Sequence, residues 1–311
     1  MPRILFSSII VLALLASSCE KVIDFDASNT RPTPVLNAIP TAGQQLFVNY
    51  SYTRFFLDTV NSHPVGNVNM VVTANGQEYR PVSINGSNYF FDYIPQEDDQ
   101  LSIHILSDAG EVAANTYIPR MPRISTPRVF VWDTVFNMLT INFDIDDHPD
   151  YHNYYRFTIS QRDSGCRHIP YLDKYDTIDT TRNTFFFCQD KALTDPTAAA
   201  TEALGGYIYT QLLTTDKLID GQRHNTTIMM ILLRDTNEVE PFIHEYTLNV
   251  ESVTPERYQY LQDIEQATSI MQLITEPAPV YSNVNGALGI FAGSSKVTFP
   301  LHYQSPYTPA R

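Results

Sequence analysis

From Val35 onward the apolar residues fall in short runs, several of which alternate with polar residues. This period of two is typical of half-buried β-strands, and no helical pattern separates the first runs. Asn75-Gly76 and Asn85-Gly86 supply the residues with positive φ that two-residue hairpin turns require. The pattern predicts an immunoglobulin-like antiparallel β-sandwich over residues 35–122. Its expected strands are LFVNYSY (46–52), VNMVVTA (68–74), NYFFDYI (88–94) and LSIHIL (101–106).

The proline-rich stretch IPRMPRISTPR at 118–128 marks the end of this sandwich, and further β-like runs follow it. We therefore expect a second antiparallel β domain over residues 123–303. The small residues at 195–204 are compatible with a short helix between its strands. The expected strands lie at 129–145, 154–162, 185–190, 207–213, 225–235 and 244–253.

One C-terminal helix has a much clearer pattern, near residues 254–271. Thr254 suits the N-cap, Pro255 the first helical position, and Glu256 the positive end of the helix dipole. Tyr258, Leu261 and Ile264 then follow at helical spacing and form an apolar face. We expect this helix to cover an open face or edge of the second sheet. The predicted fold class is mainly β, with this single helix near the C-terminus.

The N-terminal pattern differs from all of these. Residues 1–18 combine the charge of Arg3, an apolar run from Ile4 to Ala16 and small residues, which are the parts of an export signal. The run is too short to span about 30 Å of hydrocarbon as a helix. Cys19 follows at once, and residues 19–34 have no periodicity and read as a tether. Residues 304–311 read as a tail.

Small residues that end in Cys19 resemble the lipobox of bacterial lipoproteins, although Leu15 stands one place earlier than the usual pattern requires. The resemblance implies cleavage before Cys19 and lipid attachment to it. The alternative is ordinary cleavage that leaves Cys19 as a free thiol. With acyl chains the mature protein would lie on a membrane without spanning it.

The charge and composition of the chain limit the classes of partner that it can bind. A formal net charge of −14 opposes binding to nucleic acid or to an anionic lipid surface, so we expect no nucleic-acid partner and membrane contact only through the lipid anchor. Hydrophobic residues make up 43% of the chain, which is enough to bury a core. Once Cys19 is assigned to lipid, Cys166 and Cys188 remain as an even pair in an oxidising compartment. We expect a disulfide between them, with two unpaired thiols as the alternative.

Candidate chemistry is sparse. The densest polar cluster is DIDDHPDYH at 144–152, but it lacks the glycine of a calcium loop and reads as a solvated connection between strands. No G-x-S-x-G elbow or phosphate-binding glycine loop is present, and His244-Glu245 lacks the second histidine of H-E-x-x-H. We therefore predict no catalytic residue, no metal site and no cofactor. The aromatic residues of the second region suit sugar or peptide recognition, but strand alternation assigns most of them to the core.

Several segments taken together resemble a known family. They are LIDGQRHNTT at 218–227, VTPERYQYLQDIEQ at 253–266 and EPAPVYSNVNGALGIFAG at 276–293, with CEKVIDFD at 19–26 and NYYRF at 153–157 in comparable places. This order is similar to the domain of unknown function family 4249, found in cell-envelope lipoproteins of Bacteroidota. The resemblance implies a lipoprotein that is often encoded beside a TonB-dependent outer-membrane receptor. It carries over no catalytic residues.

The expected function is that of a non-enzymatic accessory binding or assembly component of a TonB-dependent nutrient-uptake system. We expect the protein on the outer membrane, anchored by lipid and facing the cell surface, with the periplasmic face as the alternative. Acidic residues soon after the cysteine are similar to the surface-export signal of this phylum; they are Glu20, Asp24 and Asp26. Two other functions stay open, a carbohydrate-processing enzyme and a purely structural envelope lipoprotein. The ligand is not indicated.

Overall fold

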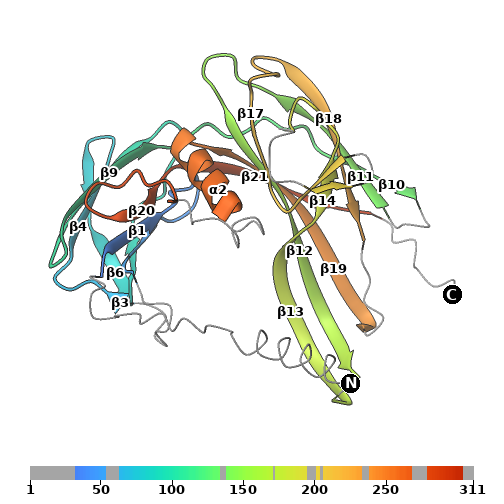
Figure 1. Cartoon of the computed structure of the whole chain (residues 1–311), viewed down its shortest axis with the longest axis horizontal. Coiled ribbons are helices and arrows are strands. Elements are labelled where there is room, and N and C mark those ends of the chain that lie inside the picture. The colour runs from blue at the N-terminus through green and yellow to red at the C-terminus, as the bar shows by residue number, and fades with distance from the viewer. Residues whose placement is uncertain are drawn as a thin grey trace, which may run out of the picture.

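The computed structural model describes residues 32–53, 63–133, 138–170, 172–194, 201–203, 206–232, 238–267 and 279–303. The predicted leader, Cys19, most of the predicted tether and the predicted tail lie outside the described residues. The described chain forms two β-sandwiches joined near a single helix (Figure 1). The prediction of a mainly β protein with one C-terminal helix is therefore confirmed.

The first sandwich consists of two sheets that face one apolar core. One sheet has the order β20-β1-β2-β7-β6, with β3 paired to β2, and the other has the order β5-β4-β8-β9. The strands of the first sheet are β1 (Pro34–Ala38), β2 (Phe47–Tyr52), β3 (His63–Pro64), β6 (Pro81–Asn85), β7 (Asn88–Phe91) and β20 (Leu288–Phe291). Those of the second are β4 (Asn69–Ala74), β5 (Gln77–Tyr79), β8 (Gln100–Ser107) and β9 (Gly110–Tyr117).

Alternation along these strands explains the core. In β8, every second residue is buried, from Leu101 through Ile103 to Ile105, while the residues between them face outward. The predicted hairpin turns are present, since Asn75 and Gly76 have φ values of 50° and 86° between β4 and β5, and Gly86 has a φ of 60° between β6 and β7. Each such φ lies in the region that glycine and asparagine tolerate best.

Strand β20 comes from far along the chain and pairs in parallel with β1. Gly289 faces Leu36 in this pairing at a φ of +108°, and an added Cβ would lie 2.1 Å from the Leu36 carbonyl oxygen. Only glycine fits so close a backbone approach. The first sandwich therefore takes one strand from residues that the sequence pattern assigned to the second region.

The second sandwich also has two sheets around one core. One has the order β10-β11-β18-β14-β16-β15, and the other has the order β13-β12-β19-β21, with β17 paired to β12. The strands of the first sheet are β10 (Arg128–Asp133), β11 (Met138–Asp146), β14 (Phe186–Cys188), β15 (Thr201–Ala203), β16 (Gly206–Tyr209) and β18 (Arg223–Ile231). Those of the second are β12 (Tyr154–Ile169), β13 (Lys174–Thr184), β17 (Leu212–Thr215), β19 (Glu238–Val253) and β21 (Ser294–Leu301). Residues 201–203 thus pair as a strand instead of continuing a short helix.

Helix α2 (Pro255–Ala267) begins as the sequence predicts. Thr254 caps it, because its hydroxyl accepts from the Arg257 amide at 3.4 Å and its carbonyl from the Tyr258 amide at 2.9 Å. The residues after 267, up to 278, lie outside the described chain. The helix lies between the two sandwiches and contacts β20 of the first and β12 of the second, so it bridges them instead of covering one sheet (Figure 1). The described helical segments include none that is long and apolar enough to cross a bilayer.

The junction of the sandwiches is built around residues 283–295. The Gly293 amide donates to the Thr116 hydroxyl at 2.9 Å, and the Thr254 amide donates to the Gly293 carbonyl at 3.3 Å. Close by, buried Glu251 pairs with Arg156 at 3.2 Å and with Arg257 at 3.0 Å. Burial lowers the pKa of Arg257, and Glu251 opposes that shift. These contacts connect strands of both sandwiches and the first turn of α2.

Candidate functional site

The acidic loop after β11 is the first candidate. Asp147 lies close to Asp216 and Asp220, which follow β17, and one carboxylate oxygen from each lies within 4.8 Å of the others. Asp147 and Asp216 are buried, and Asp220 is exposed. The sequence pattern did not reveal this cluster, because its members come from turns about seventy residues apart, and only their closeness in space brings them together.

Three oxygens of the two buried carboxylates accept hydrogen bonds from described residues, and the fourth, Asp216 Oδ1, lies 3.6 Å from His152 Nδ1. The Tyr155 hydroxyl donates to Asp147 Oδ1 at 2.5 Å, and the Gly221 amide donates to Asp147 Oδ2 at 2.9 Å. The Asn153 amide donates to Asp216 Oδ2 at 2.5 Å. Burial raises the pKa of Asp147, although these two donors to it act in the opposite sense. The arrangement ties the loop after β11 to the turn after β17, and that structural role accounts for the contacts.

The sequence interpretation of this loop as a solvated connection is therefore wrong at its centre. Asp147 and His148 are buried, and the His148 ring stacks on Tyr151 with centroids 5.7 Å apart. Asp144 is held at the surface by Arg223, at 2.7 Å, and by Asn225. Hydrogen bonds from these two side chains lower its pKa.

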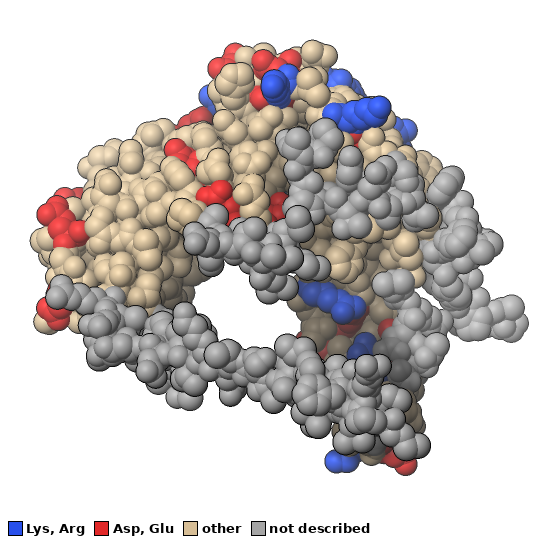
Figure 2. Space-filling model, viewed as in Figure 1, with Lys and Arg blue, Asp and Glu red and all other residues tan. Residues whose placement is uncertain are grey.

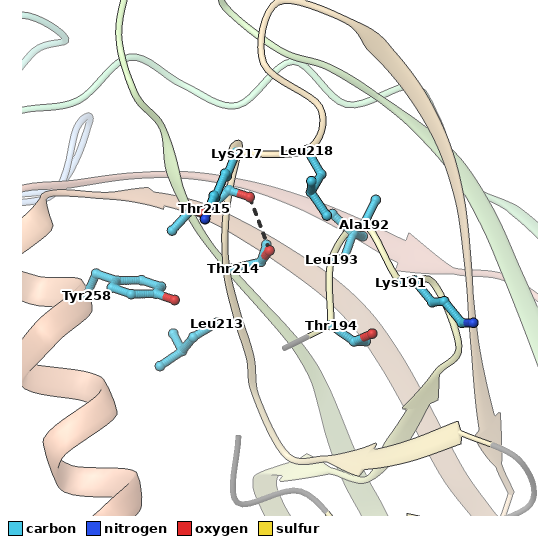
Figure 3. A pocket seen from close by; sticks show the side chains of 10 residues that line it. All are labelled: Lys191, Ala192, Leu193, Thr194, Leu213, Thr214, Thr215, Lys217, Leu218 and Tyr258. Atoms are coloured by element: carbon cyan, nitrogen blue, oxygen red, sulfur yellow. Dashed lines mark hydrogen bonds between the residues drawn. The ribbon is translucent and has the colours of Figure 1, made fainter. Parts of the chain in front are cut away.

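A small pocket opens beside α2 (Figure 3). It has a volume of about 240 Å³ and lies between the loop after β14, strand β17 and Tyr258 of the helix. Three threonines and three leucines share its wall with two of the five lysines of the chain, so it is of mixed polarity. Figure 3 shows that Lys191 extends away from Tyr258. The volume is below the roughly 300–1,000 Å³ of typical small-molecule sites.

The aromatic residues of the second region lie mostly in its core. Tyr155, Phe186, Phe187 and Tyr209 are buried. Tyr154 packs on Tyr258 of α2 with centroids 5.1 Å apart. The interpretation of these rings as core and packing residues is confirmed for these five, whereas Phe185 and Tyr175 are 59% and 68% exposed.

The longest strands of the second sandwich continue past its core as an arm (Figure 1). We define the arm as residues 162–169 of β12, 174–184 of β13 and 238–245 of β19. Along β12 the buried positions end at Asp163, and nearly every position of β13 is exposed. Figure 2 shows basic and acidic side chains together on this part of the molecule, where Arg162 pairs with Asp179 at 3.1 Å and with Glu245 at 3.3 Å.

A buried polar cluster marks the base of the arm. His244 Nδ1 lies 2.7 Å from Asp163, and His244 Nε2 lies 3.1 Å from Glu238. Gln161 donates to Asp163 Oδ1 at 2.7 Å, and Arg182 lies 3.3 Å from Asp163 Oδ2. These charge-assisted contacts hold the three strands together where the apolar core stops. Apart from His244 itself, no sequence motif indicates this cluster.

One face of the arm carries exposed apolar side chains. Ile243 and Tyr175 are 54% and 68% exposed, and Val239 is 37% exposed. Ile243 pairs with Ser164 and Val239 with Cys166, with a bulge between these two pairs, and Tyr175 pairs with His168. Their neighbours His244 and Glu238 meet on the opposite face, so Ile243 and Val239 share this face with Tyr175. Leu172, at the tip, is 52% exposed.

The cysteines do not form the expected disulfide in this structure, in which both are free. Cys166 is half-buried on the arm, between Thr177 and Val239, whereas Cys188 lies in β14 of the opposite sheet, inside the core. The even number of cysteines does not determine geometry, and these two strands belong to different sheets. Burial raises the pKa of Cys188 to about 11.

Comparison with known proteins bears on the whole chain. No curated protein matches it. Among solved structures, collagen adhesin (CNA) from S. aureus aligns over 87% of this chain and 93% of that chain, at 10% sequence identity and a TM-score of 0.19, which is too low to carry an argument. A family model described as a domain of unknown function, DUF4249, matches residues 20–299, which is most of the sequence. The protein therefore belongs to the DUF4249 family.

Proposed function

We propose that the protein is a non-enzymatic lipoprotein of the outer membrane and an accessory binding or assembly component of a TonB-dependent uptake system. Cys19 holds it on the membrane through acyl chains, most simply on the cell-surface face. The arm then docks onto the barrel receptor. The observation that carries this proposal is the arm itself, a stretch of sheet that continues beyond the core that supports it.

The length of the arm suits a docking role. At about 3.3 Å per residue, the 11 residues of β13 span roughly 36 Å. A sheet without a core is costly to maintain, because its apolar side chains remain in water. Exposed apolar side chains that share one face are typical of a protein interaction site.

The face of the arm suits a partner better than its edge does. Strand β13 is the edge of its sheet, and it carries Lys174, Asp176, Asp179 and Arg182. Charged residues on an edge strand discourage the addition of another strand. The face with Ile243, Val239 and Tyr175 offers apolar contact with a rim of ion pairs around Arg162, which is the usual anatomy of a non-obligate interface.

Affinity purification from native membranes tests the docking step. The wild-type chain should co-purify a TonB-dependent barrel receptor, and the double variant Tyr175→Glu, Ile243→Glu should lose it. Val82→Glu, Ile84→Glu is a matched control on the first sandwich, because those side chains are 63% and 62% exposed. That control should retain the receptor. Retention by the arm variant would move the interface elsewhere, and absence of any receptor with the wild type would contradict the assembly role.

Membrane attachment is tested separately. Mass spectrometry of the mature N-terminal peptide should show acyl chains on Cys19, and Cys19→Ala should release the folded protein from the membrane fraction. An unmodified thiol in membrane-bound protein would contradict the anchoring mechanism while leaving the arm untouched.

A further inference from the structure

A second, larger groove lies on the first sandwich, against the first turn of α2. It has a volume of about 400 Å³, within the range of roughly 300–1,000 Å³ of small-molecule sites. Its wall is formed by the ends of β4, β8 and β9 together with Glu256 of the helix. The groove thus lies where the two halves of the molecule meet, a common place for ligand sites.

The floor of the groove is a row of polar side chains. Thr73 pairs with Ser102, and Ser102 pairs with Asn115, so the three side chains lie side by side across three strands. Gln100 and Tyr117 pair in the next row of the same face. This face points away from the core, because the residues between them, such as Leu101 and Ile103, are the buried ones.

These groups are available to a ligand. Thr73, Gln100, Ser102 and Asn115 make no side-chain hydrogen bond to any part of the chain that the structure describes. Their neighbours at the rim are already engaged, since Asn75 donates to Asp99 at 2.6 Å and accepts from the Gln100 amide at 2.9 Å. The groove therefore combines fixed walls with a floor of free donors and acceptors.

The end of the groove has a different chemistry. The carboxylate of Glu256 lines this end, together with the ring and hydroxyl of the half-buried Tyr117. Burial raises the pKa of Tyr117, and the nearby Glu256 carboxylate raises it further, so the phenol stays protonated and able to donate. A tyrosine ring also offers an apolar surface on which a flat, weakly polar face of a ligand can pack.

The charge of the groove selects against anions. Among the described residues that line it there is no lysine or arginine, and the one acidic side chain among them is Glu256, in a chain of net charge −14. One carboxylate among several neutral amides and hydroxyls is also a poor match for a multivalent cation, which requires several oxygen ligands. The ligand that satisfies most of these groups is neutral and rich in hydroxyls that both donate and accept.

We propose that this groove is a binding site for a neutral oligosaccharide. Thr73, Gln100, Ser102 and Asn115 bond to its hydroxyl groups, Glu256 accepts from a pair of hydroxyls, and Tyr117 packs against a sugar ring. A peptide is the weaker fit, because the backbone groups of β4 and β8 under the floor are already paired in the sheet and cannot add a strand. The inference gives the proposed binding role a ligand class, and its test requires no receptor.

Isothermal titration of the purified mature chain with neutral hexasaccharides (maltohexaose, cellohexaose, xylohexaose and chitohexaose) tests the site. At least one should bind, while polygalacturonate and an unrelated decapeptide should not. Glu256→Gln should weaken binding about tenfold, because hydrogen bonds to charged groups contribute most, and Asn115→Ala should weaken it about fivefold. Ser102→Ala is a third variant whose affinity can be measured, and because position 102 is exposed, the substitution should not disturb folding.

Asn69→Ala is the matched control. Asn69 lies on the same face of the same sheet, outside the groove, where it accepts from Arg80 at 2.8 Å. It should leave the affinity unchanged. Absence of binding by all four hexasaccharides, equal affinity in the groove variants, or preference for the peptide would each overturn the proposal. Because receptor capture is measured separately, failure here and failure of the docking role are distinguishable.

Discussion

The two sandwiches have similar cores but differ in how far their strands extend. In the first, the longest described strands, β8 and β9, have 8 residues each. In the second, β12 and β19 have 16 residues each. The first sandwich therefore ends where its core ends, whereas two strands of the second continue well beyond it. Polar contacts around His244 replace apolar packing at that point.

Because of this difference, the two cores stabilise the fold, whereas the arm contacts a partner. At each core, a buried aspartate accepts hydrogen bonds from a tyrosine hydroxyl and from a backbone amide. In the first sandwich Asp99 accepts from Tyr93, and in the second Asp147 accepts from Tyr155. The described residues of the arm include no such aspartate with a tyrosine donor. We therefore expect mutations at the junction and in the cores to change folding, and mutations of the exposed side chains of the arm to change binding alone.

The largest effect should come from the junction, where one change reaches both sandwiches. A Cβ at position 293 would lie 1.8 Å from the Tyr117 carbonyl oxygen, so Gly293→Ala must displace β9 or β21. We expect a loss of about 4 kcal/mol in the free energy of unfolding. Urea titration measures the loss, and hydrogen exchange should show weaker protection in peptides from both sandwiches.

Gly43→Ala provides the control for this prediction. Its φ of +73° strains any side chain, but no described atom lies within 4 Å of the added Cβ. It should cost only about 1 kcal/mol, with the effect confined to the first sandwich. If Gly293→Ala weakened the protection of one sandwich alone, the junction would not couple them.

The second effect compares the two buried aspartates. Tyr155→Phe removes the donor to Asp147 Oδ1 and leaves a buried carboxylate short of a partner, which should cost about 1–3 kcal/mol. Tyr93→Phe should cost less, because Asp99 is more exposed than Asp147 and keeps bonds from Asn75 and the Gln96 amide. Thermal melts of both variants measure the difference. Equal losses of stability in the two variants would show that the tyrosine–aspartate hydrogen bonds do not differ between the sandwiches.

Parts of this comparison were predictable from the sequence. Alternation identified β2, β4 and β8, the Asn-Gly pairs identified two turns, and Thr254-Pro255-Glu256 identified the start of α2. All these signals are local, because each depends on residues a few positions apart. Strand length was harder to predict, since β12 alternates clearly only over the part that has a core beneath it.

Contacts between distant segments were not predictable. Nothing around Gly289 indicates that β20 pairs with β1, some 250 residues earlier in the chain. The meeting of Asp147 with Asp216 has no sequence signal for the same reason. The expected disulfide depended on cysteine number and compartment, and neither fixes which strands of which sheet carry the thiols.

A smaller effect concerns two acids of the second sandwich whose pKa shifts have opposite sign. Burial raises the pKa of Asp147, so its favourable contribution is present below about pH 4, the unfolded pKa, and is lost as the pH rises through its folded value. Burial alone would raise the pKa of Asp190, but its hydrogen bonds, including one with His224 at 2.6 Å, lower it overall. Its contribution is present above about pH 4 and is lost as the pH falls.

Melting temperatures between pH 3 and 7 test these signs. Relative to the wild type, Asp147→Asn should gain stability as the pH rises, because the substitution removes an ionisation that the fold disfavours. Asp190→Asn should lose stability over the same range. Parallel curves for both variants would contradict the assignment of opposite shifts.

The smallest effect on stability, and the sharpest separation of arm from core, should come from the two thiols. In a Cys19→Ser chain, Cys166 on the arm should react with iodoacetamide in the folded protein, and Cys188 should react only after unfolding. Cys188 is fully buried and its pKa is raised to about 11, so little thiolate is present at neutral pH, whereas Cys166 is partly exposed. Reductant should change neither the labelling nor the melting temperature. A peptide linked through Cys166 and Cys188 in a non-reducing digest would mean that the base of the arm folds back onto β14, and a covalent bond would then join the two parts that this structure keeps on separate sheets.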